Sequence, residues 1–489
     1  MKPALNLGAW RHLDGAEGGH ALWLPAEHLV THGVVVGMTG SGKTGLVTVL
    51  IEEAARAKVP VVVIDVKGDL PNLLLAFPDF DPTRLEPWVE LDGESSPEAV
   101  AARAAELAEE RRAALEEWTI GQPELSAYTK ATHVRVLTPG GTAGEPLHML
   151  SSLERRSGRW DSDPEAARDA LSAAVSLVLR LLGREPDPAK SREHVLLSVL
   201  AERRLAAGQT AELGSLMQDV LEPPIDRIGA LAVDTFMKKT ERRSLAAALN
   251  SLLASPTFAA WRQGATLDVA AWVARREGKT PIVVVSVAHL DDEERALVLG
   301  VLLEEVLSWV RTLSGSQRLR ALVLFDEVYG FLPPHPANPP TKRPLVALMK
   351  QARGFGVGVV VATQNPMDLD YRALSNAGLW FLGRLQTDAD RARVIDGLIG
   401  AHTTDTEAEA QLSTTLQRLA PRWFVVRNSH ATSPPILVNP RHAMSLMRGP
   451  MTRVEIQQAR GVTRATSLAR DPQVASDAAV FEQVATDSQ

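Results

Sequence analysis

The sequence predicts an α/β fold in which a mostly parallel β-sheet is flanked by helices. Short runs rich in Val and Ile, typical of buried parallel strands, alternate along the chain with longer stretches whose apolar residues have helical spacing. Polar residues directly follow most of these runs, at the strand ends where open α/β sheets collect ligands. The predicted buried strands are 32–36, 59–65, 281–287, 321–327 and 357–364.

A glycine-rich loop follows the first of these strands and fits the pattern G-x-x-x-x-G-K-[ST]. Its residues are Gly37, Met38, Thr39, Gly40, Ser41, Gly42, Lys43 and Thr44, and Gly45 then opens a helical stretch that extends to Lys58. Strand, glycine loop and helix in this order is the context that a phosphate-binding loop requires. The N–H groups of such a loop surround an anion, and the helix N-terminus adds a partial positive charge. We therefore expect residues 37–45 to bind a nucleotide, so the predicted fold class is a RecA-like P-loop NTPase.

Two side chains of the loop have predicted roles in nucleotide binding. Lys43 is expected to reach the β- and γ-phosphates, and the Thr44 hydroxyl is expected to ligate Mg²⁺. The alternative is a chance match in a glycine-rich turn, and the flanking strand and helix argue against it.

Composition excludes several classes of protein. A chain of 489 residues predicts two or three units, and the absence of cysteine excludes a disulfide framework, a thiolate metal site and a cysteine nucleophile. A net charge of −7 excludes a globally basic nucleic-acid binder but allows basic loops that line a pore. No apolar run approaches the roughly 18 residues that cross a bilayer, and no signal-peptide core follows Met1. We therefore expect a cytoplasmic protein with no membrane partner.

The N-terminal part, 1–150, is predicted to begin with two short strands joined by a glycine turn within residues 1–30. After the strand 59–65 comes a polar run, 65–70, which reads either as part of a ligand site or as a solvated loop. The segment 97–118 is expected to form an exposed amphipathic helix, and 134–138 a further strand.

Strand signals disappear in residues 151–264, which predicts an all-α insertion in the α/β core. Its helices are expected at 163–183, 188–207, 212–221 and 234–254. The insertion holds the densest basic cluster of the chain, formed by Lys238, Lys239, Arg242 and Arg243. Such a run is either a solvated helix face or a nucleic-acid contact.

The part 265–450 is expected to complete the α/β core. Beyond its three buried strands the predicted elements are helices at 291–313, 345–354 and 389–398 and strands at 379–385, 422–427 and 436–438. The tail, 451–489, is expected to be mostly disordered, with one short helix at 454–459.

Three polar residues at strand ends in this part are the candidate catalytic groups. Asp326 follows apolar strand residues, as an acid that completes Mg²⁺ coordination should, and Glu327 is placed to polarise a water against the γ-phosphate. Gln364 ends the next buried strand, where its amide could hold the attacking water or sense the γ-phosphate. A solvated turn for the two acids and a capping role for the glutamine are the alternatives.

These motifs together resemble the HerA/FtsK superfamily of P-loop motor ATPases, and HerA-like ATP-binding proteins above all. The resemblance covers about residues 22–440 and rests on the phosphate loop, Ile64–Asp69, Leu324–Glu327 and Gln351–Pro366. It implies ATP and Mg²⁺ as cofactors and a hexameric ring that couples ATP hydrolysis to moving DNA through a central pore. HerA proper carries an N-terminal β-barrel that docks a nuclease, whereas residues 1–30 are too few for one, so we expect no nuclease partner.

Three functions fit this resemblance. A double-stranded DNA translocase or helicase is the first, and a regulatory ATP switch in a multiprotein complex, for example in defence, is the second. A conjugation- or secretion-type translocating ATPase ranks third because the sequence shows no membrane segment. Stimulation of ATP hydrolysis by DNA separates the first from the second.

Arginines after the catalytic acids are candidates for completing the site across a subunit interface. Arg384 is the predicted trans-acting arginine finger and Arg353 a predicted cis or interface contact, with Arg372 and Arg391 close in sequence. All are expected at the rim beside the phosphate loop. Surface arginines on exposed turns are the alternative.

Overall fold

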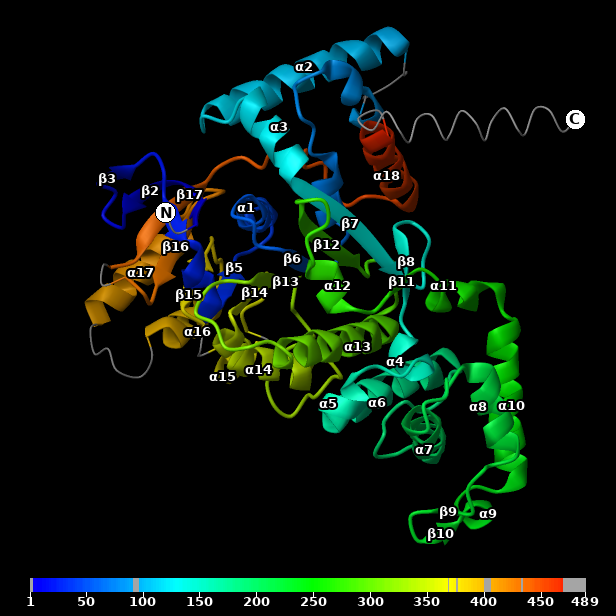
Figure 1. Ribbon diagram of the computed structural model, residues 1–489. Coiled ribbons are helices and arrows are strands. Elements are labelled where there is room, and N and C mark those ends of the chain that lie inside the picture. The colour runs from blue at the N-terminus through cyan, green and yellow to red at the C-terminus, as the bar shows by residue number, and fades with distance from the viewer. Residues whose placement is uncertain are drawn as a thin grey trace, which may run out of the picture.

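A thirteen-stranded β-sheet runs through the computed structural model, which describes residues 3–90, 96–367, 369–374, 377–399, 406–431 and 434–468 (Figure 1). Neighbouring strands are parallel from β11 to β15, and antiparallel from β15 to β3. In spatial order the strands are β11 (Ala265–Thr266), β8 (Glu145–His148), β7 (Thr132–Pro139), β12 (Thr280–Ser286), β6 (Val61–Asp65), β13 (Ala321–Asp326), β14 (Val357–Thr363), β5 (Gly33–Val36), β15 (Leu379–Leu382), β16 (Phe424–Asn428), β17 (Ile436–Pro440), β2 (Gly8–His12) and β3 (Glu17–Gly19). The predicted mostly parallel sheet and its buried strands are confirmed.

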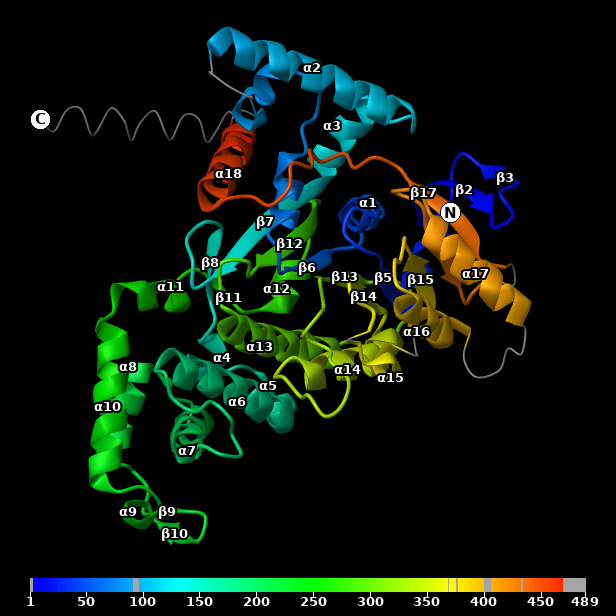
Figure 2. The same cartoon turned by 180° about the vertical axis from the view of Figure 1, so that it is seen from behind.

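Alternating side chains of the central strands pack into two separate hydrophobic cores, one on each face of the sheet, because successive residues of a strand point to opposite faces. Val62 and Ile64 belong to one core, whereas Val61 and Val63 belong to the other. Helices α12 (Val269–Val273), α13 (Asp292–Arg311) and α14 (Lys342–Gln351) cover the first face. Helices α1 (Lys43–Arg56), α2 (Pro97–Glu116) and α3 (Gln122–Ala131) cover the second (Figures 1 and 2).

The helical insertion lies beyond α13, on the side of that helix away from the sheet (Figure 1). It contacts the core through α6, which packs on α13. Its helices are α4 (Ser151–Glu154), α5 (Arg159–Ser162), α6 (Pro164–Leu181), α7 (Arg192–Ala206), α8 (Leu213–Leu221), α9 (Val233–Phe236), α10 (Lys239–Ala254) and α11 (Ala259–Arg262). The prediction of an all-α insertion needs one correction, because β9 (Arg227–Ile228) and β10 (Leu231–Ala232) form a short hairpin at its tip.

Both ends of the chain differ from the prediction. The first 25 residues form four short strands and not two: β1 (Ala4–Asn6) pairs with β4 (Trp23–Pro25), and β2 and β3 extend the large sheet. The C-terminal helix α18 (Arg453–Leu468) is longer than the predicted helix at 454–459. Residues 469–489, which we expected to be disordered, lie outside the described residues.

The remaining helices of the C-terminal part are α15 (Tyr371–Leu374), α16 (Asp388–Ile399) and α17 (Thr406–Arg418). Helix α16 was predicted, and α17 was not. Within the described ranges, no helix combines the length and the apolar character that crossing a bilayer demands.

Candidate nucleotide-binding site

The register of the parallel strands aligns their carboxyl ends at one edge of the sheet. Val36, the last residue of β5, lies opposite Thr363 on β14 and Leu382 on β15. Asp65 of β6 lies opposite Asp326 of β13 on one side and Ser286 of β12 on the other. Because the residues that follow each strand emerge at this same edge, the phosphate loop and the candidate catalytic residues come together there.

The phosphate loop is held by main-chain hydrogen bonds to both neighbouring strands. The Gly37 N–H donates to the Thr363 carbonyl at 3.3 Å, and the Met38 N–H donates to the Arg384 carbonyl at 3.1 Å. Gly42, directly before α1, has φ +93°, a conformation that other residues adopt only with strain. A Cβ atom on Gly42 would also approach the Cα of Arg422 to 3.0 Å. The loop is thus shaped and supported by contacts within the chain.

Lys43 is the first residue of α1 and its side chain is buried. Burial lowers the pKa of this ammonium group to about 8, against the opposing effects of Glu327 and Asp326. A desolvated cation gains most from a strong anion at close range. The geometry therefore fits the predicted contact of Lys43 with nucleotide phosphates.

Asp326 and Asp65 form a buried acidic pair beside Lys43. Burial first, and then the charges of Asp65 and Glu327, raise the pKa of Asp326 to about 7. Asp65 is already bound, because its Oδ1 accepts from the Gly68 N–H at 2.9 Å and its Oδ2 accepts from the Ser286 hydroxyl at 2.8 Å. Asp326 is therefore the better candidate for a metal ligand, together with the Thr44 hydroxyl on the first turn of α1.

The donor set fits Mg²⁺ bound with a nucleotide. In the described part of the chain, no group of three or more His, Asp or Glu side chains could hold a metal ion by itself. Mg²⁺ takes few protein ligands and completes its octahedral shell with phosphate oxygens and water. Thr44 and Asp326 would supply the protein oxygens of such a site.

Glu327 and Gln364 meet at the same edge and are linked to the phosphate loop. The Gln364 main-chain N–H donates to Glu327 Oε1 at 3.1 Å, and the Thr39 hydroxyl of the loop donates to Gln364 Oε1 at 2.7 Å. Glu327 has φ +59°, which is rare for a residue with a side chain and is typical of functional sites. The structure thus brings together Glu327, the candidate base, Gln364, the candidate γ-phosphate sensor, and the phosphate loop.

The candidate arginines lie in different places, and the expectation that all line the loop is wrong. Arg384 is exposed and flanks the protomer's own loop through its carbonyl. Arg353 lies in the turn before β14, at the opposite edge of the sheet, in a cavity of about 980 Å³ that His28 and His430 also line. A cis contact of Arg353 with its own phosphate loop is therefore excluded, and an interface contact is left.

Arg391 is no candidate for a free finger. Its side chain is buried and donates to the carbonyls of Leu385 and Gln386 and to the Ser413 hydroxyl, so it fixes the start of α16. Arg372 belongs to α15, and its side chain lies outside the described part of the structure.

The sequence reasoning did not assign two residues that the structure places at the site. Lys67, in the turn after β6, forms an ion pair with Glu327 at 2.8 Å. Arg422 donates its main-chain N–H to the Ser41 carbonyl at 3.0 Å and bonds the Pro440 carbonyl through its guanidinium group. The polar run 65–70 was a signal for the first, whereas nothing in the local sequence marked Arg422.

The basic cluster at the start of α10 is only partly available to a ligand. Arg242 is buried and donates to the carbonyls of Val220 and Met237, with an ion pair to Asp234 at 2.7 Å. It is therefore a structural residue, and its predicted place in a nucleic-acid contact is wrong. Lys238, Lys239 and Arg243 are exposed.

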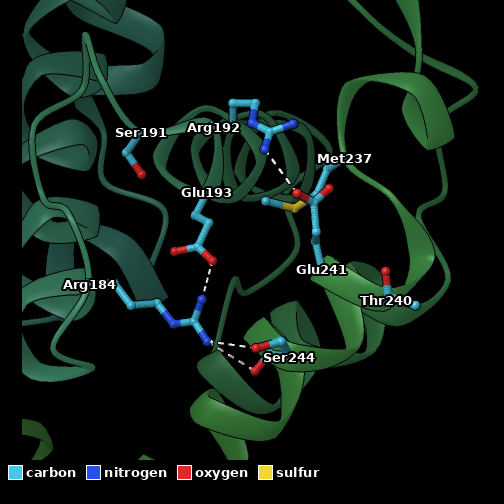
Figure 3. A pocket seen from close by; sticks show the side chains of 8 residues that line it. All are labelled: Arg184, Ser191, Arg192, Glu193, Met237, Thr240, Glu241 and Ser244. Carbon is cyan, nitrogen blue, oxygen red and sulfur yellow. Dashed lines mark hydrogen bonds and ion pairs between the residues drawn. The ribbon is translucent and has the colours of Figure 1, made fainter.

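A cavity of about 520 Å³ lies between α7 and α10, and Met237, Thr240 and Glu241, from the same stretch of chain as the cluster, help to line it (Figure 3). Two arginines hold the walls of the cavity together. Arg192 pairs with Glu241 at 2.9 Å, and Arg184 pairs with Glu193 and donates to the Ser244 hydroxyl. These contacts therefore hold α7 and α10 together at this surface of the insertion.

Comparison with known proteins gives a sequence match and a fold match. Residues 22–106 match the family DUF87, described as the central domain of helicase HerA. VirB4 of Thermoanaerobacter pseudethanolicus has a similar structure, with 13% sequence identity over 91% of this chain and 98% of that chain and a TM-score of 0.52. The plasmid coupling protein TrwB, solved with a non-hydrolysable ATP analogue, gives 14% identity over 91% of each chain and a TM-score of 0.45. No curated protein sequence matches the chain.

The family match contains the phosphate loop, and the fold match extends over nearly the whole chain. The chain therefore has the fold of the P-loop ATPases, and its predicted resemblance to HerA-like proteins is confirmed over residues 22–106.

Proposed function

We propose that the protein is an ATP-hydrolysing motor of the HerA/FtsK type, which forms a hexameric ring and moves double-stranded DNA. The observation that carries ATP hydrolysis is the chain of contacts from Thr39 in the phosphate loop through Gln364 to Glu327. It joins the group that binds phosphate to the group that would activate water. DNA and the ring are supported by the resemblance to the superfamily.

Each residue of the site has a proposed task in hydrolysis. Lys43 offsets the charge of the β- and γ-phosphates, and Thr44 and Asp326 would hold Mg²⁺, which adds further charge neutralisation when bound. Glu327 accepts a proton from the attacking water, and the Gln364 amide orients that water.

Two distinct surfaces support assembly of a ring. The phosphate loop lies at one edge of the sheet, and exposed Arg353 lies at the other. Rings are built by head-to-tail interfaces, in which one surface of a subunit contacts a different surface of the next. We propose that Arg353 contacts the nucleotide of the neighbouring subunit and that Arg384 contacts the nucleotide of its own subunit. This reverses the assignment from sequence, and the main-chain hydrogen bond from the Met38 N–H to the Arg384 carbonyl supports the cis role of Arg384.

Two alternatives use the same nucleotide site. One is a regulatory ATP switch that gates a partner protein, and the other is a translocating ATPase of the conjugation or secretion type. Neither has its own supporting contact among the described residues.

One experiment tests the proposal against the regulatory switch. ATP turnover is measured with and without duplex DNA, and the oligomeric state is measured in the same buffer. We expect a hexamer whose turnover rises with duplex DNA. Turnover that is unaffected by DNA would contradict the motor proposal and favour the switch.

A further inference from the structure

Lys67 holds the carboxylate of Glu327 in an ion pair. Its Nζ lies 2.8 Å from Glu327 Oε2, while Glu327 Oε1 accepts from the Gln364 N–H at 3.1 Å. Both carboxylate oxygens therefore have a donor. The Glu327 side chain is 13% exposed, so its pairing with Lys67 is partly shielded from water.

The turn that carries Lys67 is fixed from both sides. Asp65 accepts from the Gly68 N–H, and the Gly68 carbonyl accepts from the Met451 N–H at 3.0 Å. The Asn72 amide bridges the carbonyls of Asp69 and Gly449, at 2.8 and 2.7 Å. The C-terminal segment 449–451 thus anchors the main chain from which Lys67 reaches Glu327.

A carboxylate held in this way is a poor general base. Each of its oxygens already has a donor from the chain, and an attacking water would have to displace one of them. Productive hydrolysis needs this ion pair to loosen.

We propose that Lys67 is a positioning residue that restrains Glu327 and keeps ATP turnover low without DNA. The inference rests on the proposed function, because it gives the ion pair a role in the coupling of turnover to DNA. The ion pair of Lys67 is with the proposed base, so we expect it to act on the rate of hydrolysis and not on the affinity for ATP.

The test compares Lys67→Met with Lys67→Arg and with Lys58→Met, an exposed lysine at the far end of α1. For Lys67→Met we expect kcat without DNA to rise about three- to five-fold, since a part-exposed ion pair of this kind is worth about that factor. KM for ATP and the DNA-stimulated rate should stay unchanged, so the stimulation factor falls. Lys67→Arg, which keeps the ion pair, should behave as the wild type, and so should Lys58→Met.

Two results of this test would overturn the proposal. A lower kcat with a higher KM in Lys67→Met would make Lys67 a phosphate contact. Unchanged kinetics would show that the ion pair has no role in turnover.

A second measurement needs no activity. The rate at which an amine-reactive reagent acetylates each lysine is measured by mass spectrometry in the wild type and in Glu327→Gln. Loss of the ion pair should speed modification of Lys67 and leave that of Lys58 unchanged. Equal rates of Lys67 acetylation in both proteins would contradict the restraint of Glu327 by Lys67. This result does not depend on ATP turnover, whereas a complete lack of ATP turnover in the wild type would refute the proposed function.

Discussion

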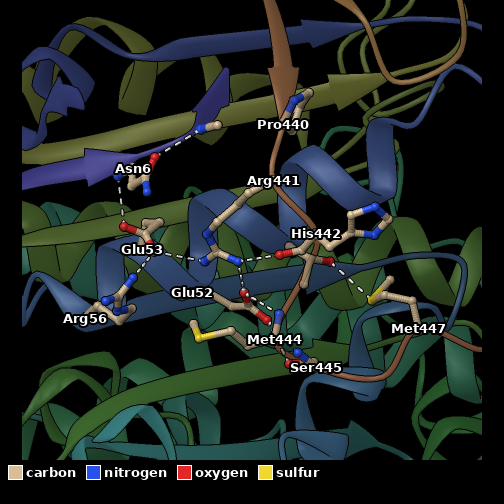
Figure 4. Close-up of polar contacts among 12 residues, drawn as sticks. Asn6, Glu52, Glu53, Arg56, Pro440, Arg441, His442, Met444, Ser445 and Met447 are labelled. Carbon is tan, nitrogen blue, oxygen red and sulfur yellow. Dashed lines mark hydrogen bonds and ion pairs between the residues drawn. The ribbon is translucent and has the colours of Figure 1, made fainter. Parts of the chain in front are cut away.

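Arg441 and Glu52 form an ion pair at 2.9 Å in which neither side chain is exposed, although 389 residues separate them in the sequence. Arg441 also pairs with Glu53 at 2.9 Å, and Glu52 accepts from the main-chain N–H groups of Met444 and Ser445 (Figure 4). Both acids lie on α1, the helix that starts at the phosphate loop. The network therefore ties the C-terminal segment to the helix that positions the nucleotide site.

Removal of Arg441 should destabilise the protein strongly. Arg441→Met leaves Glu52 and Glu53 buried without their cation, and breaking a buried pair in this way costs about 3–5 kcal/mol. Urea unfolding followed by fluorescence would measure the loss. The double variant Arg441→Met/Glu52→Gln should recover part of it, and Arg103→Met, which removes an exposed helix-surface pair, should cause little change. Equal midpoints for Arg441→Met and Arg103→Met would refute the structural role of the network.

Two substitutions at the nucleotide site should separate binding from turnover. Lys43→Ala removes the buried cation of the phosphate loop and should abolish nucleotide binding or hydrolysis. Glu327→Gln keeps the shape of the side chain but cannot act as a base, so binding should persist while turnover stops. Fluorescent-nucleotide titration and phosphate release would measure both quantities. Equal loss of binding in the two variants would contradict these roles.

The basic cluster should divide into a structural and a DNA-binding part. Arg242→Ala leaves the Val220 and Met237 carbonyls without their donor and should lower the unfolding midpoint. Neutralising Lys238, Lys239 and Arg243 should leave the midpoint unchanged. If the three contact phosphates, the salt dependence of DNA binding should flatten by about one unit of slope per contact. An unchanged slope in the triple variant would exclude this surface from DNA binding.

Much of the fold and the main part of the site could be predicted because their signals are local. The phosphate loop, Asp326, Glu327 and Gln364 each lie at the end of an apolar strand, and parallel register brings such ends together. Sequence reasoning failed where a side chain depends on distant partners. Nothing near Arg242 or Arg391 in the sequence shows that folding buries them.

The failure to assign Lys67 has the same physical origin, whereas the error over Arg353 concerned the edge of the sheet. Lys67 reaches Glu327 because segment 449–451, far away in the sequence, fixes its turn. The role of Arg353 depends on which edge of the sheet its turn occupies: it precedes β14, whereas Gln364 follows that strand. A strand of seven residues separates opposite edges by more than about 20 Å.

His32 should make stability depend on pH. Its ring is fully buried and accepts from the Val359 N–H at 3.0 Å, and burial, followed by the charge of Arg353, lowers its pKa from 6.5 to about 4. Between these two pH values the unfolded chain binds the proton of His32 more tightly than the folded chain does. The resulting loss of folding stability is therefore absent above about pH 6.5. Protonation of His32 in the unfolded chain lowers the free energy of unfolding progressively as the pH falls toward 4, by about 3 kcal/mol in total.

The comparison variant for this effect is His32→Asn, because Asn tolerates the positive φ of 66° and keeps a side-chain acceptor. Unfolding free energies at pH 7 and pH 5 would be compared between the two proteins. The variant should lose less stability than the wild type over this interval. Equal losses in both would assign the pH dependence to other groups.

Mixed rings should show which arginine acts on a neighbouring subunit. A protomer with Glu327→Gln keeps both arginines but has no base, and a protomer with Arg353→Ala has the base but lacks that arginine. If Arg353 acts in trans, an intact base meets an intact arginine at some interfaces of the mixed ring, and partial turnover returns. Mixing Glu327→Gln with Arg384→Ala should restore nothing, because Arg384 flanks its own loop and a cis residue cannot be supplied by a neighbour. Recovery in the Arg384 mixture alone would reverse the two roles, and full turnover by a monomeric sample would exclude any trans arginine and the ring as well.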